Sequence, residues 1–371
     1  MKNVLLSYCI LSCLLIGCNK SSSAQKQGQD PMEPTNQNDQ HKSANPAQKS
    51  NIIRLVKHQV MDTEGTAMVA STYLLPTDWT VQDKLYWEYR DPTVPIRFQS
   101  MMQNADGSMR IQIYPDVRAS WYTGPAGTNG YRPPSDIITG MKDLIKVERK
   151  GKNIHYVGQK ILSDADNHNP SARQKYQSGV INIEYDDNGQ TYEEEFYGRL
   201  DISDIVTPTV YGNSEAIIWG ASGLTSFRAL KGKLGESRKI AQTVSSSARL
   251  TKPFYNKLAQ VLQLLSDQTY AQIFQAGQIS RIISQTNDQM IANIDASYRQ
   301  SQQSADRMNA QFSDYIRGVD RYTNAGSDVQ LPSGYDNAWV NDRGEYILTN
   351  STGYDPGRDY DGSWKQLQRQ N

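Results

Sequence analysis

The feature that most constrains the fold of this 371-residue chain is a pair of alternating runs in the segment "GVINIEYDDNGQTYEEEFYG". Apolar and polar residues alternate on both sides of Asp187-Asn188-Gly189, and Asn-Gly is a strong signal for a tight turn between antiparallel strands. A similar pattern surrounds residues 104–107, which read Asn-Ala-Asp-Gly. We therefore predict antiparallel sheet over this part of the chain.

One helix is predicted within the same region. Apolar residues recur at helical spacing from Ile137 to Ile145, behind Ser135, a residue type that caps helices. Further along, Gly220 and Gly223 interrupt a strand pattern, which indicates a bulge or a bend. Residues 51–232 are thus predicted to form an α+β domain, an antiparallel sheet with a packed helix.

The character of the sequence changes over residues 233–322, where helical spacing predominates. Apolar residues share one face from Phe254 to Leu265, and a regular heptad pattern runs from Ile291 to Val319. The positions that flank the heptad seam carry no complementary charges, so a helical hairpin within the chain is favoured over a coiled-coil dimer. The predicted fold class is therefore α+β, followed by a long helical hairpin and a small C-terminal β module.

The C-terminal module, residues 323–371, is predicted from alternating runs around an Asn-Asp-Arg-Gly turn at 341–344. It is rich in aromatic residues that could bind a ligand: Tyr335, Trp339, Tyr346, Tyr354 and Trp364. One interpretation is an aromatic platform for sugar rings or for a peptide strand. The other is that a module of this size needs these large side chains as its own core.

The N-terminus has the pattern of an export signal. Residues 4–17 are mainly apolar, but as a helix they would cover only about 20 Å of the ~30 Å hydrocarbon core of a bilayer. The sequence that follows, Leu15-Ile16-Gly17-Cys18, resembles the lipobox of bacterial lipoproteins. The resemblance implies removal of residues 1–17 as a signal peptide and attachment of lipid, palmitate included, to Cys18.

Residues 18–50 are almost devoid of apolar side chains and are predicted to be a disordered tether. Asn19 differs from the Asp that marks retention at the inner membrane, so the resemblance implies lipid anchoring in the outer membrane, facing the periplasm or the cell surface. Cleavage would also remove Cys9 and Cys13, which leaves no disulfide in the mature chain.

Two further resemblances concern other parts of the chain. Residues 73–115, with a Pro-x-x-Trp strand and an Asp-Gly-Ser hairpin, are similar to the opening of the PsbP-like α/β/α fold, which mostly serves binding and assembly. The C-terminal part resembles a group of uncharacterised bacterial lipoproteins. The shared motifs are Ile-Arg-Gly-Val-x-x-Tyr at 316–322, Leu-Pro-x-Gly-Tyr at 331–335 and Trp-x-Asn-x-x-Gly-Glu-Tyr at 339–346.

Composition and motifs give little support to catalysis or to nucleic-acid binding. The 39 basic and 39 acidic side chains cancel without forming long blocks, so we predict no nucleic-acid partner. Ser222 lies in a segment that departs from a nucleophile elbow, because Leu224 stands where glycine is required. We expect Glu193, Glu194 and Glu195 to lie on an exposed strand, and we predict no catalytic residue, metal or cofactor.

These observations favour a lipid-anchored envelope protein with a non-catalytic binding or scaffolding role. Its expected partners are the membrane, through lipid on Cys18, and envelope proteins or peptidoglycan. Two alternatives stay open: binding of peptidoglycan through the C-terminal aromatic residues, and an enzyme whose site follows no familiar motif.

Overall fold

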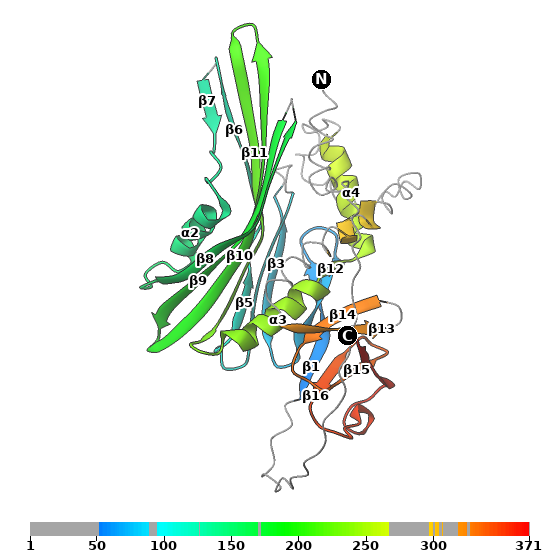
Figure 1. The fold of residues 1–371 in the computed structure, drawn as a ribbon. Coiled ribbons are helices and arrows are strands. Elements are labelled where there is room, and N and C mark those ends of the chain that lie inside the picture. The colour runs from blue at the N-terminus through cyan, green and yellow to red at the C-terminus, as the bar shows by residue number, and fades with distance from the viewer. Residues whose placement is uncertain are drawn as a thin grey trace, which may run out of the picture.

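The structure is a computed structural model that describes residues 52–88, 95–125, 127–169, 172–266, 297–299, 301–303, 306, 318–324 and 327–370. This part of the chain is built mainly from antiparallel strands, arranged in a large curved sheet, a six-stranded sheet and a small three-stranded sheet (Figure 1).

The large sheet has nine strands. Its main path, in spatial order, consists of β3 (Thr80–Trp87), β4 (Ile96–Gln103), β5 (Arg110–Ile113), β11 (Gly212–Leu230), β10 (Gln190–Thr209), β9 (Ala172–Asp187) and β8 (His155–Asn169). The hairpin of β6 (Val117–Gly124) and β7 (Gly127–Gly130) pairs with β11 beyond the end of β5. Strand β11 therefore has β5 beside one half and β6 beside the other.

The local predictions for this sheet are confirmed. Strands β9 and β10 meet at a turn in which Asn188 and Gly189 have φ values of 51° and 76°, as a two-residue hairpin turn requires. The register between β10 and β11 shifts next to Gly198, and Gly223 opposite has a φ of 61°. This is the bulge that the glycine pattern indicates, whereas Gly220 pairs regularly with Asp201.

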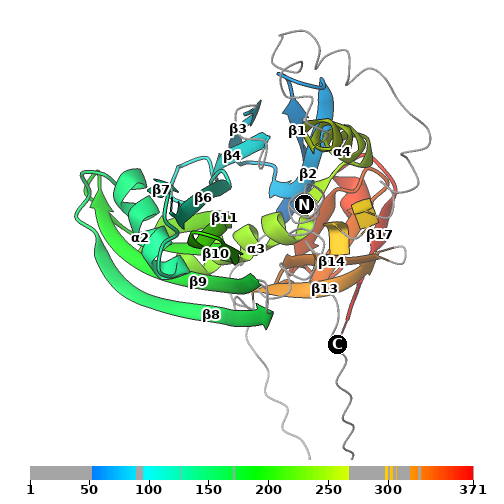
Figure 2. The same cartoon turned by 90° about the horizontal axis from the view of Figure 1, so that it is seen from above.

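Helix α2 (Ile137–Glu148) packs on β9 and β10, inside the curve of the sheet (Figure 2). Two glycines that face each other across these strands, Gly179 and Gly198, allow the close approach. A Cβ atom at Gly179 would lie 2.8 Å from the Ile137 side chain, and one at Gly198 would lie 3.2 Å from the Met141 sulfur. The predicted helix is confirmed, but its N-cap is Asp136, which accepts a hydrogen bond from the Thr139 amide at 2.8 Å.

The six-stranded sheet joins distant parts of the chain. Its order is β12 (Arg249–Leu250), β2 (Met68–Pro76), β1 (Ile53–Asp62), β16 (Tyr346–Thr349), β15 (Asn337–Asn341) and β17 (Trp364–Gln366). The three-stranded sheet consists of β14 (Ser327–Pro332), β13 (Val319–Asn324) and β18 (Gln368–Arg369), and a short 3₁₀ helix, η2, covers Pro356–Arg358. The C-terminal strands thus complete a sheet that β1 and β2 begin.

Helix α3 (Leu234–Ser247) contacts β2, β11 and β14, which belong to three different sheets. Its apolar residues Ile240, Ala241 and Val244 are buried in a core that also contains side chains from both larger sheets. Helix α4 (Lys252–Ser266) adds Phe254 and Val261 to this core. The two larger sheets and the two helices therefore share one hydrophobic core.

The predicted fold class is wrong, because strands dominate the structure and no long helical hairpin is present among the described residues. Helices α3 and α4 are separated by β12, and α3 buries its apolar face against the sheets rather than against a second helix. Val319, the last residue of the predicted heptad seam, begins strand β13. Residues 307–317 and 267–296, which carry most of that seam, lie outside the described residues.

The N-terminal predictions also fall outside this part of the chain. Residues 1–51, with the predicted signal peptide, Cys18 and the predicted tether, are not described. Of the helices that the structure describes, none is long and apolar enough to cross a bilayer.

Candidate functional site

The predicted C-terminal aromatic residues do not gather on one surface. Trp339 pairs with Ile347 and Val340 pairs with Tyr346, so Trp339 and Tyr346 lie on opposite faces of the sheet. Tyr346 is 8% exposed and belongs to a core cluster with Leu348, against which Tyr335 also packs. The face that carries Tyr346 is therefore internal.

On the other face, Trp364 pairs with Asn341 and lies on the same side as Trp339. Its ring is 6.3 Å from that of Tyr360. Tyr354 is half-buried, and burial together with Asp359 raises its pKa to about 12. Trp339 and Trp364 therefore lie on the face of β15 and β17 opposite the cluster of Tyr346.

A buried polar network corrects the expectation for the three adjacent glutamates. Glu194 and Glu195 are 1% and 0% exposed. Helix α2 packs on one face of β10, and on the other face α3 packs on the neighbouring β11 and contacts Glu195 through Arg238. Arg149, which follows α2, donates to both carboxylate oxygens of Glu194, with Nε to Oε2 at 2.8 Å and Nη2 to Oε1 at 2.5 Å. Tyr185 donates to the same carboxylate at 2.9 Å. The expected exposed strand face is in fact an interior surface.

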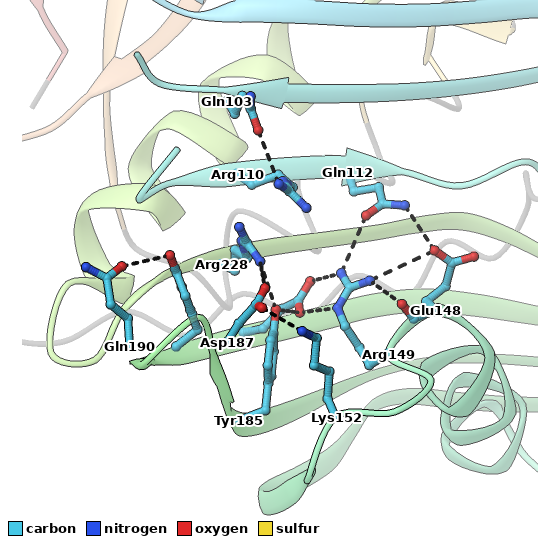
Figure 3. Close-up of polar contacts among 12 residues, drawn as sticks. Gln103, Arg110, Gln112, Glu148, Arg149, Lys152, Tyr185, Asp187, Gln190 and Arg228 are labelled. Carbon is cyan, nitrogen blue, oxygen red and sulfur yellow. Dashed lines mark hydrogen bonds and ion pairs between the residues drawn. The ribbon is translucent and has the colours of Figure 1, made fainter. Parts of the chain in front are cut away.

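The network continues across the sheet toward β5 (Figure 3). Arg228 on β11 and Arg110 on β5 are directly opposite each other, and burial followed by repulsion from Arg228 lowers the pKa of Arg110. Arg228 is 3.6 Å from Asp187, which also accepts from Lys152 at 2.5 Å. The carboxylates of this network face cations and do not form an acid–base pair. The network therefore joins the end of α2 to the sheet.

A cavity of about 320 Å³ lies between the two larger sheets and α3, on the opposite face of β5 and β11 from this network. Its lining comes from β2, β4, β5, β11, α3, β12 and residues 301–302, and most of it is apolar. The lining residues are Ser71, Tyr73, Phe98, Ile111, Ile113, Thr225, Ala241, Val244, Ser245, Ala248, Arg249, Leu250, Ser301 and Gln302.

Two polar side chains at the cavity, Tyr73 and Arg249, have partners within the protein, whereas the buried Oε1 of Gln302 has none among the described residues. The Tyr73 hydroxyl donates to Asp83 at 3.1 Å, and Asp83 also contacts His58 Nε2 at 2.6 Å. Burial raises the pKa of Tyr73, so the phenol stays neutral. Arg249 donates to the Ser246 carbonyl at 3.0 Å and to Asp306 at 2.7 Å. A cavity of this size and lining suits an apolar ligand.

The sequence predictions missed this cavity because its residues are scattered over strands far apart in the chain. One local signal was present. Ala241, Val244 and Ser245 are three to four positions apart on one face of α3, Ala248 follows the helix directly, and all four side chains are short enough to leave space beside it. Within the described residues, no cluster of three or more histidine, cysteine, aspartate or glutamate side chains is arranged to hold a metal ion.

No model of a known protein family matches this chain, and a search of curated proteins finds no match either. The geometry therefore defines the class by itself, as an antiparallel β protein with an apolar cavity between two sheets.

Proposed function

We propose that this protein is a lipid-anchored envelope protein that binds an apolar ligand, such as a single acyl chain, in the cavity between its two sheets. The observation that carries the proposal is the apolar lining of that cavity, which is built from strands of both sheets and from α3. Ligand pockets of proteins have volumes of roughly 300–1,000 Å³ and are mainly apolar.

The lining also favours the interpretation of the cavity as a ligand site over its interpretation as a packing defect. An empty apolar cavity destabilises a fold in proportion to its volume, because the lining atoms lose their contacts. The cavity wall includes Phe98, Ile113 and Leu250, which are only partly buried. An acyl chain would restore the missing contacts of the apolar lining.

Titration with dodecanoic acid tests the proposal, using wild type and a variant in which the cavity is filled. Ala248 lines the cavity and has extended backbone angles, with φ −64° and ψ 124°, which suit a large residue. We expect Ala248→Phe to weaken binding at least tenfold. Ala165→Phe is the matched control, because Ala165 is exposed on β8, remote in the sheet order from the cavity strands.

Equal affinities of the two variants and wild type would contradict a ligand site in this cavity. Circular dichroism of each variant shows whether the substitution alters the fold, and a smaller replacement, Ala248→Leu, is used if Ala248→Phe does so.

The anchoring part of the proposal rests on the resemblance of residues 15–18 to a lipobox. Two or more acyl chains hold a protein stably on a bilayer, so Cys18→Ser should move the protein from the membrane fraction to the soluble fraction. Retention of the variant in the membrane fraction would exclude Cys18 as the anchor.

Peptidoglycan binding through the C-terminal aromatic residues has less support. Such a platform needs several rings on one accessible face, whereas Trp339 and Tyr346 lie on opposite faces of their sheet. Scaffolding of other envelope proteins remains compatible with the proposed anchoring.

A further inference from the structure

The long hairpin of β10 and β11 projects beyond the rest of the large sheet and ends in two apolar residues (Figure 1). Val210 and Tyr211 form the turn between Thr209 and Gly212, and they are 92% and 84% exposed. They are more exposed than any other large apolar residue in the described part of the chain. The tip thus presents apolar surface that the fold does not cover.

The tip itself carries no charge. Residues 205–214, which form the end of the hairpin, contain no Asp, Glu, Lys or Arg, and neither do residues 119–131. The second segment belongs largely to the β6–β7 hairpin, which lies beside β11 with Tyr122 opposite Ala216. Tyr122 and Tyr131 are 47% and 77% exposed. Glu215 pairs with Val206 on one side and with Thr123 on the other, so it separates the two segments. The uncharged surface is therefore the tip of the β10–β11 hairpin itself, residues 205–214, in a chain of which 21% is charged.

The residue types in the turn between β10 and β11 indicate that the fold itself does not require the side chains of Val210 and Tyr211. Two-residue turns between antiparallel strands favour Asn, Gly and Asp, and valine and tyrosine are unusual there. Neither Val210 nor Tyr211 has a positive φ, and their high exposure means that they contribute little to packing. Their side chains are available for contact with another body.

We propose that this uncharged tip, residues 205–214, contacts the surface of a lipid bilayer. Tyrosine prefers the boundary between headgroups and hydrocarbon, where its ring is buried and its hydroxyl stays hydrated. Valine gains from entering the hydrocarbon, and the lack of charge removes the main cost of insertion. A protein partner is the competing occupant, but a hairpin tip without charged side chains offers little basis for its specificity.

The contact is weak by itself, since few side chains enter the lipid. The proposal therefore rests on the proposed membrane anchoring, but it does not rest on the ligand cavity. An anchor converts the contact into an intramolecular event with a high effective concentration. The reach is sufficient: the 20 residues of β10 span roughly 65 Å, whereas residues 18–50 extend to about 110 Å at most.

Site-specific fluorescence tests this proposal in a way that does not depend on lipidation. The chain from residue 18 onward carries Cys18→Ser and an N-terminal histidine tag, and is held on phosphatidylethanolamine–phosphatidylglycerol vesicles that contain a nickel-chelating lipid. Because the mature chain then has no other cysteine, Val210→Cys can be labelled with an environment-sensitive dye. The matched control is Val147→Cys, a 71% exposed position at the end of α2.

We expect nitroxide groups on the lipid acyl chains to quench the dye at position 210 at least threefold more than the dye at position 147. Adding Tyr211→Ser to the labelled protein should reduce that difference. Equal quenching at the two positions would overturn the proposal, whatever the result for Cys18 or for the cavity, and would leave a protein partner as the occupant of the tip.

Discussion

At the residue scale, the adjacent glutamates Glu194 and Glu195 show how this sheet buries charge on both faces. Glu194 is paired with Arg149 beneath α2, and Glu195 accepts from Arg238 of α3 at 2.7 Å. The alternation of a strand predicts that the two side chains point in opposite directions, and they do. It does not show that a helix covers each face, which is why the expected exposure was wrong.

Glu195 makes the stability of the protein depend on pH. Burial raises its pKa, with Arg238 acting in the opposite sense, and its Oε1 has no hydrogen-bond partner among the described residues. Between the ordinary pKa of a glutamate and the raised value, the folded state binds more protons than the unfolded state. The free energy of unfolding therefore falls as pH rises through this interval.

We predict that Glu195→Gln removes this contribution. Relative to the variant, wild type should lose stability as pH rises above the ordinary pKa of a glutamate, as measured by urea unfolding at each pH. Glu193→Gln serves as the control, since Glu193 is only half-buried and accepts from the Gly232 amide. Parallel pH profiles of wild type and Glu195→Gln would show that Glu195 has no raised pKa.

At the scale of elements, the hairpins could be predicted from the sequence, but the helical region could not. Asn188-Gly189 determines a turn by local backbone chemistry, so the surrounding strands follow directly. The heptad spacing up to Val319 states only a period and does not identify what the apolar face packs against. The same holds for α3, whose apolar face packs against the two larger sheets and not against a second helix. Val319, at the end of the heptad pattern, lies in a strand.

The contact between α2 and the sheet depends on Gly198. A Cβ atom there would lie 2.7 Å from a Leu224 methyl group and 3.2 Å from the Met141 sulfur, so Gly198→Ala should overpack the contact. We expect the free energy of unfolding to fall by about 1–3 kcal/mol.

Two further variants separate overpacking from a general effect of alanine in a strand. Gly158→Ala on β8 should leave stability nearly unchanged, because its Cβ would meet only Asn182, at an ordinary 3.8 Å. Gly198→Ala should cost less in the Met141→Ala background than in wild type, because the shorter side chain leaves room for the added methyl group. If Gly158→Ala and Gly198→Ala have the same effect in chemical denaturation, α2 does not rest on these glycines.

At the scale of the whole molecule, the cavity is a product of topology. Tyr73, Ile111 and Ala248 are far apart in the sequence and come together only because the strand order and α3 bring both sheets around one core. No local sequence motif predicts such a site. The spacing of small residues on α3 predicts free space beside that helix, but not that two sheets enclose it.

The central claim is that this cavity holds an apolar chain, and the position of a bound ligand tests it most directly. Methyl-labelled protein with dodecanoic acid should give intermolecular nuclear Overhauser effects to Val244 and Leu250, which line the cavity. Ile347, fully buried in the C-terminal part of the six-stranded sheet, should give none. Contacts to surface methyl groups instead, or the absence of any contact to Val244 and Leu250 in the saturated complex, would contradict the account.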